Sequence, residues 1–213
     1  MSNRGAFPIP LPPEMAAGTL SLEQAIDRRR SQRHYSDLPL SLTELGRLLH
    51  SAYGVTDSRH RLRAAPSAGA LYPLEVYVVV NHVQGLARGI YHYVPDHHAL
   101  EVVRSGDFQD ALASRALGQE VIARASVILA IVAVVERTSK RYKSRAERYV
   151  YFEAGHLAQN VCLQATALKL GCCPTGAFLD DEVDQLLGVD GERERAIYLL
   201  AVGRVEGRTD REP

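Results

Sequence analysis

Apolar residues recur along the chain with two different periods, and these periods predict helices in some segments and strands in others. Between residues 41 and 53, leucines return every three or four positions, which is the spacing of an amphipathic helix. Ser41 begins this segment and Glu44 follows three residues later, as in a capping box. Residues 74–81 and 126–135 are instead apolar runs rich in β-branched residues, which are typical of buried strands. This mixture predicts the α/β or α+β class.

Shorter patterns predict the remaining elements. Residues 89–103 predict a hairpin whose turn lies near Pro95 and Asp96. Residues 139–170 predict one long amphipathic helix, with Gly171 as its C-cap. The other expected elements are a helix through residues 22–30 capped by Thr19 or Ser21, helical turns within 107–124, a helix over 180–188 and a last strand over 195–203.

The length of 213 residues fits one domain with arms. Residues 1–18 are rich in Pro, Gly and Ala and predict an extended N-terminal arm outside the core, followed by a domain over 19–207 and a tail over 208–213. No apolar run is long enough to cross a bilayer, and the first fifteen residues lack the apolar region of a signal peptide. We therefore expect a cytoplasmic protein with no membrane partner.

Charge and metal-binding residue types narrow the function classes. The 25 basic residues balance 25 acidic ones, which argues against a nucleic-acid partner. Three clustered cysteines are too few for a disulfide framework, so we expect reduced thiols, with Cys172 and Cys173 as small buried residues. The histidines of the hairpin could form a metal site, but we favour polar hairpin residues and expect no metal; they are His92, His97 and His98.

This neutral chain nevertheless gathers four arginines around Ser31, within six residues; they are Arg28, Arg29, Arg30 and Arg33. Arginine makes bidentate phosphate contacts and stays charged at any working pH. If the helix continues through this segment, Arg29, Arg30 and Arg33 lie within one turn and could surround a phosphate. The alternative is that they interact with the helix dipole, at roughly 0.3–1 kcal/mol each. From the residues alone, both interpretations remain open.

The loop over residues 66–73, "PSAGALYP", is built from small residues that leave its backbone open to a ligand. Ser67 and Gly69 can offer backbone N–H groups, and Gly69 tolerates unusual φ/ψ angles. Such a loop suits a flat ring whose edge carries carbonyls and ring nitrogens. The alternative is an ordinary loop that leads into the next strand.

Taken in order, "LPPE", "RRRSQRHY", "PSAGALYP", "EAGHLAQN", "CCPTGAF" and "LLAVGR" resemble the nitroreductase-like FMN flavoprotein superfamily. Within it the chain is similar to the SagB-type branch, which includes the azoline dehydrogenases, from about Leu11 to Arg204. The resemblance implies an α+β fold with a mostly antiparallel sheet flanked by helices. It also implies a homodimer with FMN at the interface. The small residues of the long helix would then pack at that interface or, alternatively, within the chain; they are Ala154, Gly155, Ala158 and Ala165.

The resemblance also implies which residues hold FMN. The arginine–serine motif would bind the phosphate and ribityl chain, the loop would approach the isoalloxazine ring, the segment after the long helix would cover another part of the flavin, and a basic residue after the last strand would reach the phosphate. These residues are Arg29, Arg30, Ser31 and Arg33; Pro66, Ser67, Ala68, Gly69 and Leu71; Pro174, Thr175 and Gly176; and Arg204.

One position departs from the azoline dehydrogenases, in which a Lys-Tyr pair opens the long helix. Here the pair is Arg141 and Tyr142, and arginine is a poor general base. Tyr142 could donate a proton or line the pocket. Arg141, Arg145 and Arg148 share one face of the predicted helix. These arginines could bind an anionic substrate. We favour the alternative that they form a solvated face and pair with Glu147 or Glu153. His156 is expected to be a structural histidine with its hydrogen bonds satisfied, not a catalyst.

These features predict an FMN-dependent oxidoreductase that moves a hydride through flavin N5, with NAD(P)H as a candidate reductant. Its substrate would be a small molecule or a peptide, stacked on the ring. One alternative is an O2-dependent dehydrogenase of the azoline type in peptide heterocycle maturation. Another is a non-catalytic FMN-binding module.

Overall fold

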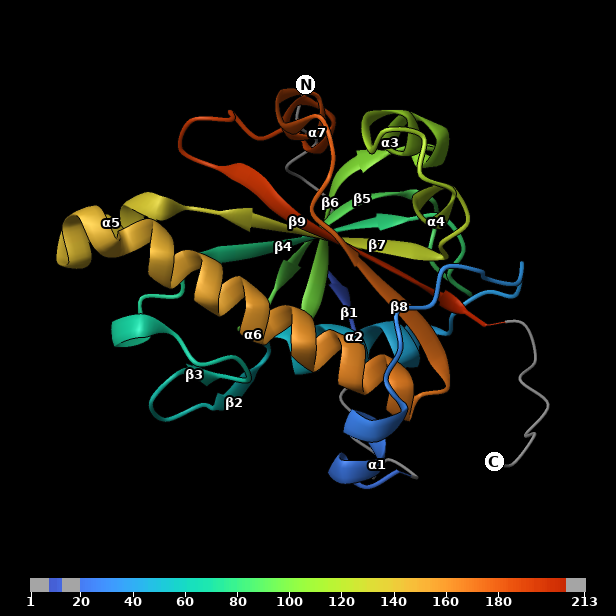
Figure 1. Ribbon diagram of the computed structural model, residues 1–213, viewed down its shortest axis with the longest axis horizontal. Coiled ribbons are helices and arrows are strands. Elements are labelled where there is room, and N and C mark those ends of the chain that lie inside the picture. The colour runs from blue at the N-terminus through green and yellow to red at the C-terminus, as the bar shows by residue number, and fades with distance from the viewer. Residues whose placement is uncertain (1–7, 13–19, 206–213) are drawn as a thin grey trace.

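A single large sheet organises the molecule, and the computed structural model describes it over residues 8–12 and 20–205 (Figure 1). The strands are β1 (Ile9–Pro10), β2 (Val55–Asp57), β3 (Leu62–Arg63), β4 (Leu74–Val80), β5 (Gly89–Val94), β6 (Ala99–Ser105), β7 (Val127–Ala133), β8 (Leu170–Thr175) and β9 (Arg195–Arg204). Seven of them form a sheet in the order β1-β6-β5-β4-β7-β9-β8, and β2 pairs with β3 in a separate hairpin. All of these strand pairs are antiparallel, as the α+β prediction requires.

Helices cover both faces of the sheet. They are α1 (Leu22–Arg28), α2 (Leu42–Tyr53), α3 (Gln109–Arg115), α4 (Glu120–Ala123), α5 (Val135–Tyr142), α6 (Ala146–Ala167) and α7 (Asp180–Leu187), with 3-10 turns η1 (Ala68–Ala70) and η2 (Lys143–Arg145). The core on one face is shared by α2 and α6, and the core on the other by α3, α4 and α7. Figure 1 shows α6 crossing the first face. In the described part of the chain, no helix is both long and apolar enough to span a membrane.

The strand β7 lies inside this sandwich and is buried at every position. It pairs with β4 along one edge, from Leu74 opposite Ala133 to Val80 opposite Val127, and with β9 along the other. Continuous burial explains why its sequence is an unbroken apolar run, because neither of its faces meets water. The prediction of a central strand is confirmed.

Both predicted N-caps are present. Ser41 and Glu44 form the capping box of α2, and Ser21 forms a second one with Gln24 at the start of α1. In each box the serine hydroxyl accepts from the backbone N–H three residues later, while the acidic or amide side chain accepts from the backbone N–H of the serine. Each box satisfies two N–H groups that a helix start leaves without partners. The predicted hairpin over 89–103 is also confirmed, as β5 and β6.

The prediction of one helix over residues 139–170 is wrong. Lys143, with φ of 50°, separates α5 from the longer α6, which ends at Ala167. Gly171 is no helix cap but lies in β8, opposite Gly203 of β9. A Cβ atom at Gly203 would lie 2.6 Å from Cγ of Tyr35, so the two glycines leave the space in which the tyrosine ring packs. At Gly171 a Cβ atom would lie 2.8 Å from Cβ of Gln32 and 2.9 Å from Cε1 of Tyr35, which explains glycine at that position.

Two further expectations need correction. Residues 8–12 of the predicted arm contribute to the core, because Leu11 is 5% exposed and Ile9 pairs with Leu100. The other residues of the predicted arm and the predicted tail over 208–213 lie outside the described residues. The small residues of α6 do not form an open stripe. Three of them are buried in the chain's own core, and only Gly155 is exposed; the three are Ala154, Ala158 and Ala165.

Replacing Gly203 with Ala should lower the free energy of unfolding by about 1–3 kcal/mol, because the added methyl group overpacks the site that holds the Tyr35 ring. Gln185→Ala is the control, since Gln185 is exposed on α7. At an exposed helix position this change should be neutral or slightly stabilising. Urea unfolding of both variants measures the difference, and equal effects would contradict the close contact.

Candidate functional site

The arginine segment lies in extended backbone against the edge of the sheet, and not on a helix as predicted. The helix α1 ends at Arg28, and Ser31 forms a parallel bridge with Cys172 of β8. The backbone N–H of Gln32 donates to the carbonyl oxygen of Cys172 at 3.1 Å. Tyr35 also holds this segment against the sheet, because its hydroxyl donates to the carbonyl oxygen of Ala201 in β9 at 3.0 Å. Ser31, Arg30 and Arg33 are exposed, and a ligand can reach them.

Two arginines of this segment lie beside the cysteines. The hydrogen bond with Cys172, and then the charge of Arg29, hold the pKa of the Cys162 thiol below its usual range, against the effect of burial. Burial raises the pKa of Cys173, and the charge of Arg33 opposes that shift. All three cysteines are free and buried; burial was predicted for Cys172 and Cys173. The charges of Arg29 and Arg33 are therefore felt at the cysteines on and near β8.

Arg30 has a different role. Its Nη1 atom donates to the carbonyl oxygens of Asp27 and Arg29, at 2.7 and 2.8 Å. These are carbonyls at the end of α1, where a positive charge meets the negative end of the helix dipole. The capping alternative thus describes Arg30, whereas the charges of Arg29 and Arg33 act on the cysteines.

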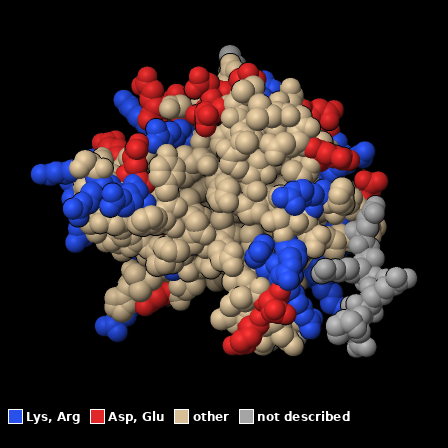
Figure 2. All heavy atoms as spheres, in the orientation of Figure 1, with Lys and Arg blue, Asp and Glu red and all other residues tan. Residues whose placement is uncertain are grey.

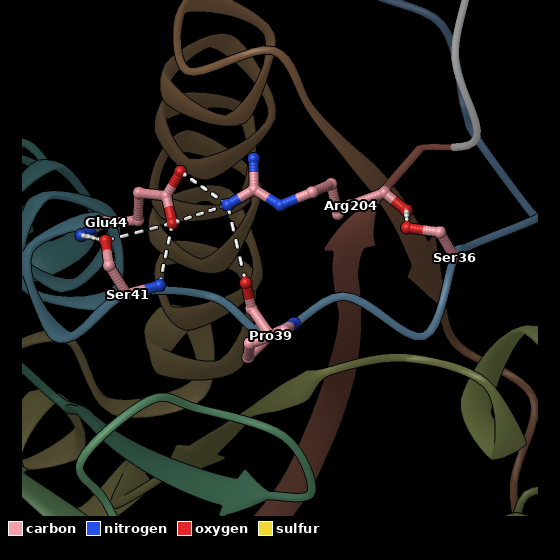
Figure 3. Close-up of polar contacts among 5 residues, drawn as sticks. All are labelled: Ser36, Pro39, Ser41, Glu44 and Arg204. Atoms are coloured by element: carbon pink, nitrogen blue, oxygen red, sulfur yellow. Dashed lines mark hydrogen bonds and ion pairs between the residues drawn. The ribbon is translucent and has the colours of Figure 1, made fainter.

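Arg204, at the end of β9, lies between Ser36 and the start of α2 (Figure 3). Its Nη2 atom is 2.9 Å from both carboxylate oxygens of Glu44 and 3.4 Å from the carbonyl oxygen of Pro39. Its own carbonyl oxygen accepts from the backbone N–H of Ser36 at 2.7 Å. Glu44 therefore both caps α2 and neutralises Arg204, and this pairing holds the arginine beside the segment that carries Ser31.

The segment after α6 continues along the same edge of the sheet. Pro174 and Thr175 belong to β8 and pair with Leu200 and Leu199 of β9. Thr175 is buried, while Gly176 is exposed, and a Cβ atom there would meet open space. Along β8 the structure thus places Ser31 beside Cys172, Arg204 opposite Leu170 at the start of the strand, and Pro174 and Thr175 at its end.

The loop over residues 66–73 forms a second group. It contains the turn η1 and three residues in the left-handed region, namely Gly69 (φ 66°), Ala70 (φ 53°) and Tyr72 (φ 48°). This conformation is open to glycine but costs other residues roughly 1–2 kcal/mol each. Such a loop persists only where its surroundings hold it.

Several contacts hold the end of this loop. The Ser67 hydroxyl accepts from the backbone N–H of Tyr72 at 2.9 Å, and Arg137 donates to the Tyr72 carbonyl oxygen at 3.0 Å. The backbone N–H of Val134 donates to the carbonyl oxygen of Pro73 at 2.7 Å. The end of β7 and the start of α5 thus anchor the loop where it enters β4.

The predicted Arg141–Tyr142 pair lies directly against this loop. A Cβ atom at Gly69 would be 2.8 Å from Nη1 of Arg141 and 3.0 Å from the hydroxyl oxygen of Tyr142. The Tyr142 ring also contacts Tyr149, with 4.7 Å between ring centroids. Two groups predicted from separate motifs are therefore neighbours, and Gly69 is required both by its φ angle and by this close approach.

The cations near this point have no acidic partners within the described residues, where no ion pair closer than 4.0 Å involves Arg141, Lys143, Arg145 or Arg148. Figure 2 shows Lys and Arg gathered over the end of α5. The favoured pairing with acids is wrong, because Glu147 bonds to Arg195 at 2.8 Å and Glu153 is buried. The predicted continuous face is also interrupted, by the break at Lys143.

The histidines are placed as follows. His92 bonds to Glu75 at 2.8 Å, and Tyr93 and His98 are hydrogen-bonded at 2.9 Å. No three His, Cys, Asp or Glu side chains in the described part of the chain are grouped to hold a metal. His156 is exposed on α6, so the expectation of a satisfied structural histidine is wrong.

Sequence reasoning missed the residues beneath the loop. Glu153 is 2% exposed, and the fully buried Tyr53 donates to it at 2.5 Å. The guanidinium of Arg63 lies over the rings of Tyr53 and Tyr72, 4.3 and 4.7 Å from their centroids. One signal in the sequence could have indicated that Glu153 is buried: it precedes the apolar Ala154 directly and lies one turn before Leu157.

The two groups of candidate residues contact different parts of α6. Arg29 lies near Cys162, whereas Ser67 lies near Glu153. These helix positions are nine residues apart, which corresponds to about 13 Å at 1.5 Å per residue. The chain therefore presents two surfaces, one basic and one formed by the open loop, and not one pocket.

Comparison with known proteins places this arrangement. A model of the nitroreductase family matches residues 26–204. The putative nitroreductase MJ1384 of Methanocaldococcus jannaschii is 44% identical over 87% of this chain and 91% of its own. The trifolitoxin-processing protein TfxB of Rhizobium leguminosarum bv. trifolii is 31% identical over 80% of this chain, which spans about half (49%) of that relative. A crystal structure of a putative nitroreductase from Anabaena variabilis superimposes with a TM-score of 0.78 at 33% identity, over 87% of this chain and 38% of that one.

The fold and the family match together assign this chain to a family. The chain belongs to the nitroreductase family, a family of oxidoreductases, and its homologues include a processing protein of the trifolitoxin system.

Glu75 supports the loop through Arg137, and this support should depend on pH. Burial alone would raise the pKa of Glu75, but the bonds from His92 and Arg137 outweigh it and hold the pKa below its ordinary value of 4.5. A lowered pKa contributes stability that is present above about pH 4.5 and is lost as the pH falls through the folded value. The stability advantage of wild type over Glu75→Gln should therefore shrink between about pH 5 and about pH 3.

Urea unfolding of both proteins at the two pH values provides the measurement. Glu147→Gln is the control, because its ion pair with Arg195 is exposed and such pairs contribute little. An advantage of Glu75 that is equal at both pH values would contradict the ionised pairing.

Proposed function

We propose that this protein is an FMN-dependent oxidoreductase, in which a hydride passes through flavin N5 and a small organic substrate stacks on the ring. The observation that carries the proposal is the position of Arg141 and Tyr142 against Gly69. A reacting group would lie beside this contact, next to the loop that the family resemblance assigns to the isoalloxazine ring. FMN, when bound, supplies the ring that accepts and releases the hydride.

The residues present fit FMN in chemical type. Arg29, Ser31 and Arg33 offer charge and hydrogen-bond donors along an accessible edge of the sheet, as a phosphate requires. Arg204, whose charge is balanced by Glu44, would add guanidinium hydrogen-bond donors beside them. At the other surface Pro66, Gly69 and Ala70 are exposed, so the open backbone of the loop can approach a flat ring. Pro174, Thr175 and Gly176 would cover part of the cofactor from β8.

We further propose a homodimer with FMN between two copies. In α6 the side chains of Tyr151 and Phe152 are 51% and 55% exposed, and the exposed Gly155 follows them. Large exposed aromatic residues beside a glycine suit close contact with a second chain. An interface of this kind would bring together surfaces that lie apart within one chain.

Replacing Arg33 with Glu should weaken FMN binding by about 1 kcal/mol or more, roughly a fivefold rise in Kd, because a charge-assisted bond is replaced by repulsion. Arg28→Glu is the matched control: it makes the same charge change in the same segment, but Arg28 ends α1 and lies outside the proposed site. Flavin titration by fluorescence quenching measures both affinities. Equal affinities for Arg33→Glu and wild type would refute the phosphate site.

The cations around Arg141 suggest the class of substrate. Arg141 lies against Gly69 and has no acidic partner among the described residues, so an anionic group on the substrate could pair with it. Arg141→Gln should lower kcat/KM for a nitroaromatic carboxylate by about two- to fivefold, the effect of an exposed ion pair. For the uncharged methyl ester of the same compound, kcat/KM should change less. An equal loss for both compounds would exclude charge recognition by Arg141.

A second candidate is a dehydrogenase of the azoline type that passes electrons to O2 and acts on a peptide. The similarity to the trifolitoxin-processing protein favours it, whereas Arg141 in place of lysine opposes it, because arginine cannot act as a general base. Anaerobic addition of NAD(P)H separates the candidates. Bleaching of bound flavin supports the first, and reduction only by a peptide substrate supports the second. Reduced flavin that persists in air with every acceptor would indicate a non-catalytic FMN-binding module.

A further inference from the structure

A buried carboxylate lies beneath the loop over residues 66–73. Glu153 belongs to α6 and is 2% exposed, so its desolvation must be offset by hydrogen bonds or charge. The hydroxyl of Tyr53 donates to its Oε1 atom at 2.5 Å, and the hydroxyl of Ser67 also hydrogen-bonds to it. Tyr53 comes from α2 and Ser67 from the start of the loop. One carboxylate therefore joins two helices and the loop.

The direction of each hydrogen bond follows from the backbone. The N–H of Tyr72 donates to the Ser67 hydroxyl oxygen at 2.9 Å, and the N–H of Leu74 donates to the Tyr53 hydroxyl oxygen at 3.3 Å. Each hydroxyl has a single proton, and each meets the carboxylate of Glu153. An ionised Glu153 satisfies both hydroxyls at once. The carboxylate thus acts, through two hydroxyls, on backbone groups at the end of the loop.

Arg63 supplies the opposite charge. Its guanidinium lies over the rings of Tyr53 and Tyr72, and its Nη1 atom is buried without a hydrogen-bond partner. Burial raises the pKa of Glu153 above its ordinary value, and the bonds from Ser67 and Tyr53 and the charge of Arg63 offset only part of that shift. The backbone N–H of Arg63 also donates to the hydroxyl of Tyr72 at 3.3 Å. The polar cluster therefore surrounds Tyr72, a left-handed residue of the loop.

We propose that Glu153 is a positioning residue that holds the loop over residues 66–73 in its left-handed conformation, through the hydroxyls of Tyr53 and Ser67. The claim that Glu153 thereby places Gly69 against Arg141 and the flavin rests on the proposed function. The claim that Glu153 holds the conformation of the loop does not depend on it. We name Glu153, Tyr53, Ser67 and Arg63 the Glu153 cluster.

The cost of the arrangement supports a specific role. Apolar residues of similar volume often stabilise a fold at least as well as a buried charge with its partners. Simple packing of α6 therefore does not require Glu153, whose α6 neighbours Val150, Ala154 and Leu157 are buried and apolar. What the carboxylate adds is a fixed orientation of the hydrogen bonds made by two hydroxyl groups. It sets the rotation of two hydroxyls, and these select the backbone conformation at Tyr72 and Leu74.

The test measures local hydrogen–deuterium exchange, by mass spectrometry with peptides that span residues 66–74, in the full-length protein without and with FMN. The variants are Glu153→Gln and Tyr53→Phe, which keep the side-chain shapes. Asp184→Asn and Tyr91→Phe are the matched controls. Asp184 is a buried acid that accepts from the N–H of Ala196, and Tyr91 is a buried tyrosine bonded to the Ala87 carbonyl oxygen; both lie outside the Glu153 cluster.

The proposal predicts that the amides of Tyr72 and Leu74 exchange about tenfold faster in both variants than in wild type, with peptides from β7 unchanged and both controls like wild type. With FMN added, the same variants should bind more weakly and shift the visible spectrum of the bound flavin. Wild-type exchange at Tyr72 and Leu74 in the variants, or an equal increase throughout the sheet, would overturn it. If wild type binds no FMN, the proposed function fails, whereas exchange in the flavin-free protein still decides the role of Glu153.

Discussion

The structure depends on the complete burial of β7, between β4 and β9. A strand without solvent on either face must keep both hydrogen-bonded edges, and its register is therefore strongly constrained. That register brings the end of β7 beside the start of β4, where Val134 bonds to Pro73. The segment that follows β7 becomes α5 and carries Arg141 and Tyr142 to the loop that precedes β4. The site next to Gly69 is thus a consequence of strand pairing in the core.

A second consequence concerns the edge of the sheet. The strand β9 pairs with β7 on one side and with β8 on the other, and its glycine at position 203 faces Gly171 beneath the Tyr35 ring. This contact holds the segment that carries Ser31 against β8, within reach of Arg204. The basic surface therefore depends on two glycines that leave room for one aromatic ring, and the loop surface depends on a buried carboxylate. Both rest on α6, about 13 Å apart along its axis.

Much of this could be predicted from the sequence. Local signals were sufficient for the capping box of α2, for Ser21 as one of two candidate caps of α1, for β4 and β7, and for the hairpin of β5 and β6. Apolar periodicity and capping depend on neighbours in the chain. The same signals failed where long-range contacts decide. The helical spacing of the arginines was overridden by pairing with β8, and Gly171 was assigned to a helix end because its partner Tyr35 is distant in sequence. The burial of Glu153 likewise depends on Tyr53 and Ser67, which no local pattern connects to it.

The claim that unites the two surfaces is that they bind FMN for electron transfer. The most direct test is the anaerobic visible spectrum of the protein, purified with added FMN, freed of unbound flavin and then titrated with NAD(P)H. The account predicts a yellow protein with about one flavin per chain, as two FMN sites in a homodimer require, whose absorbance bleaches as reductant is added. A colourless protein that retains no flavin would contradict it.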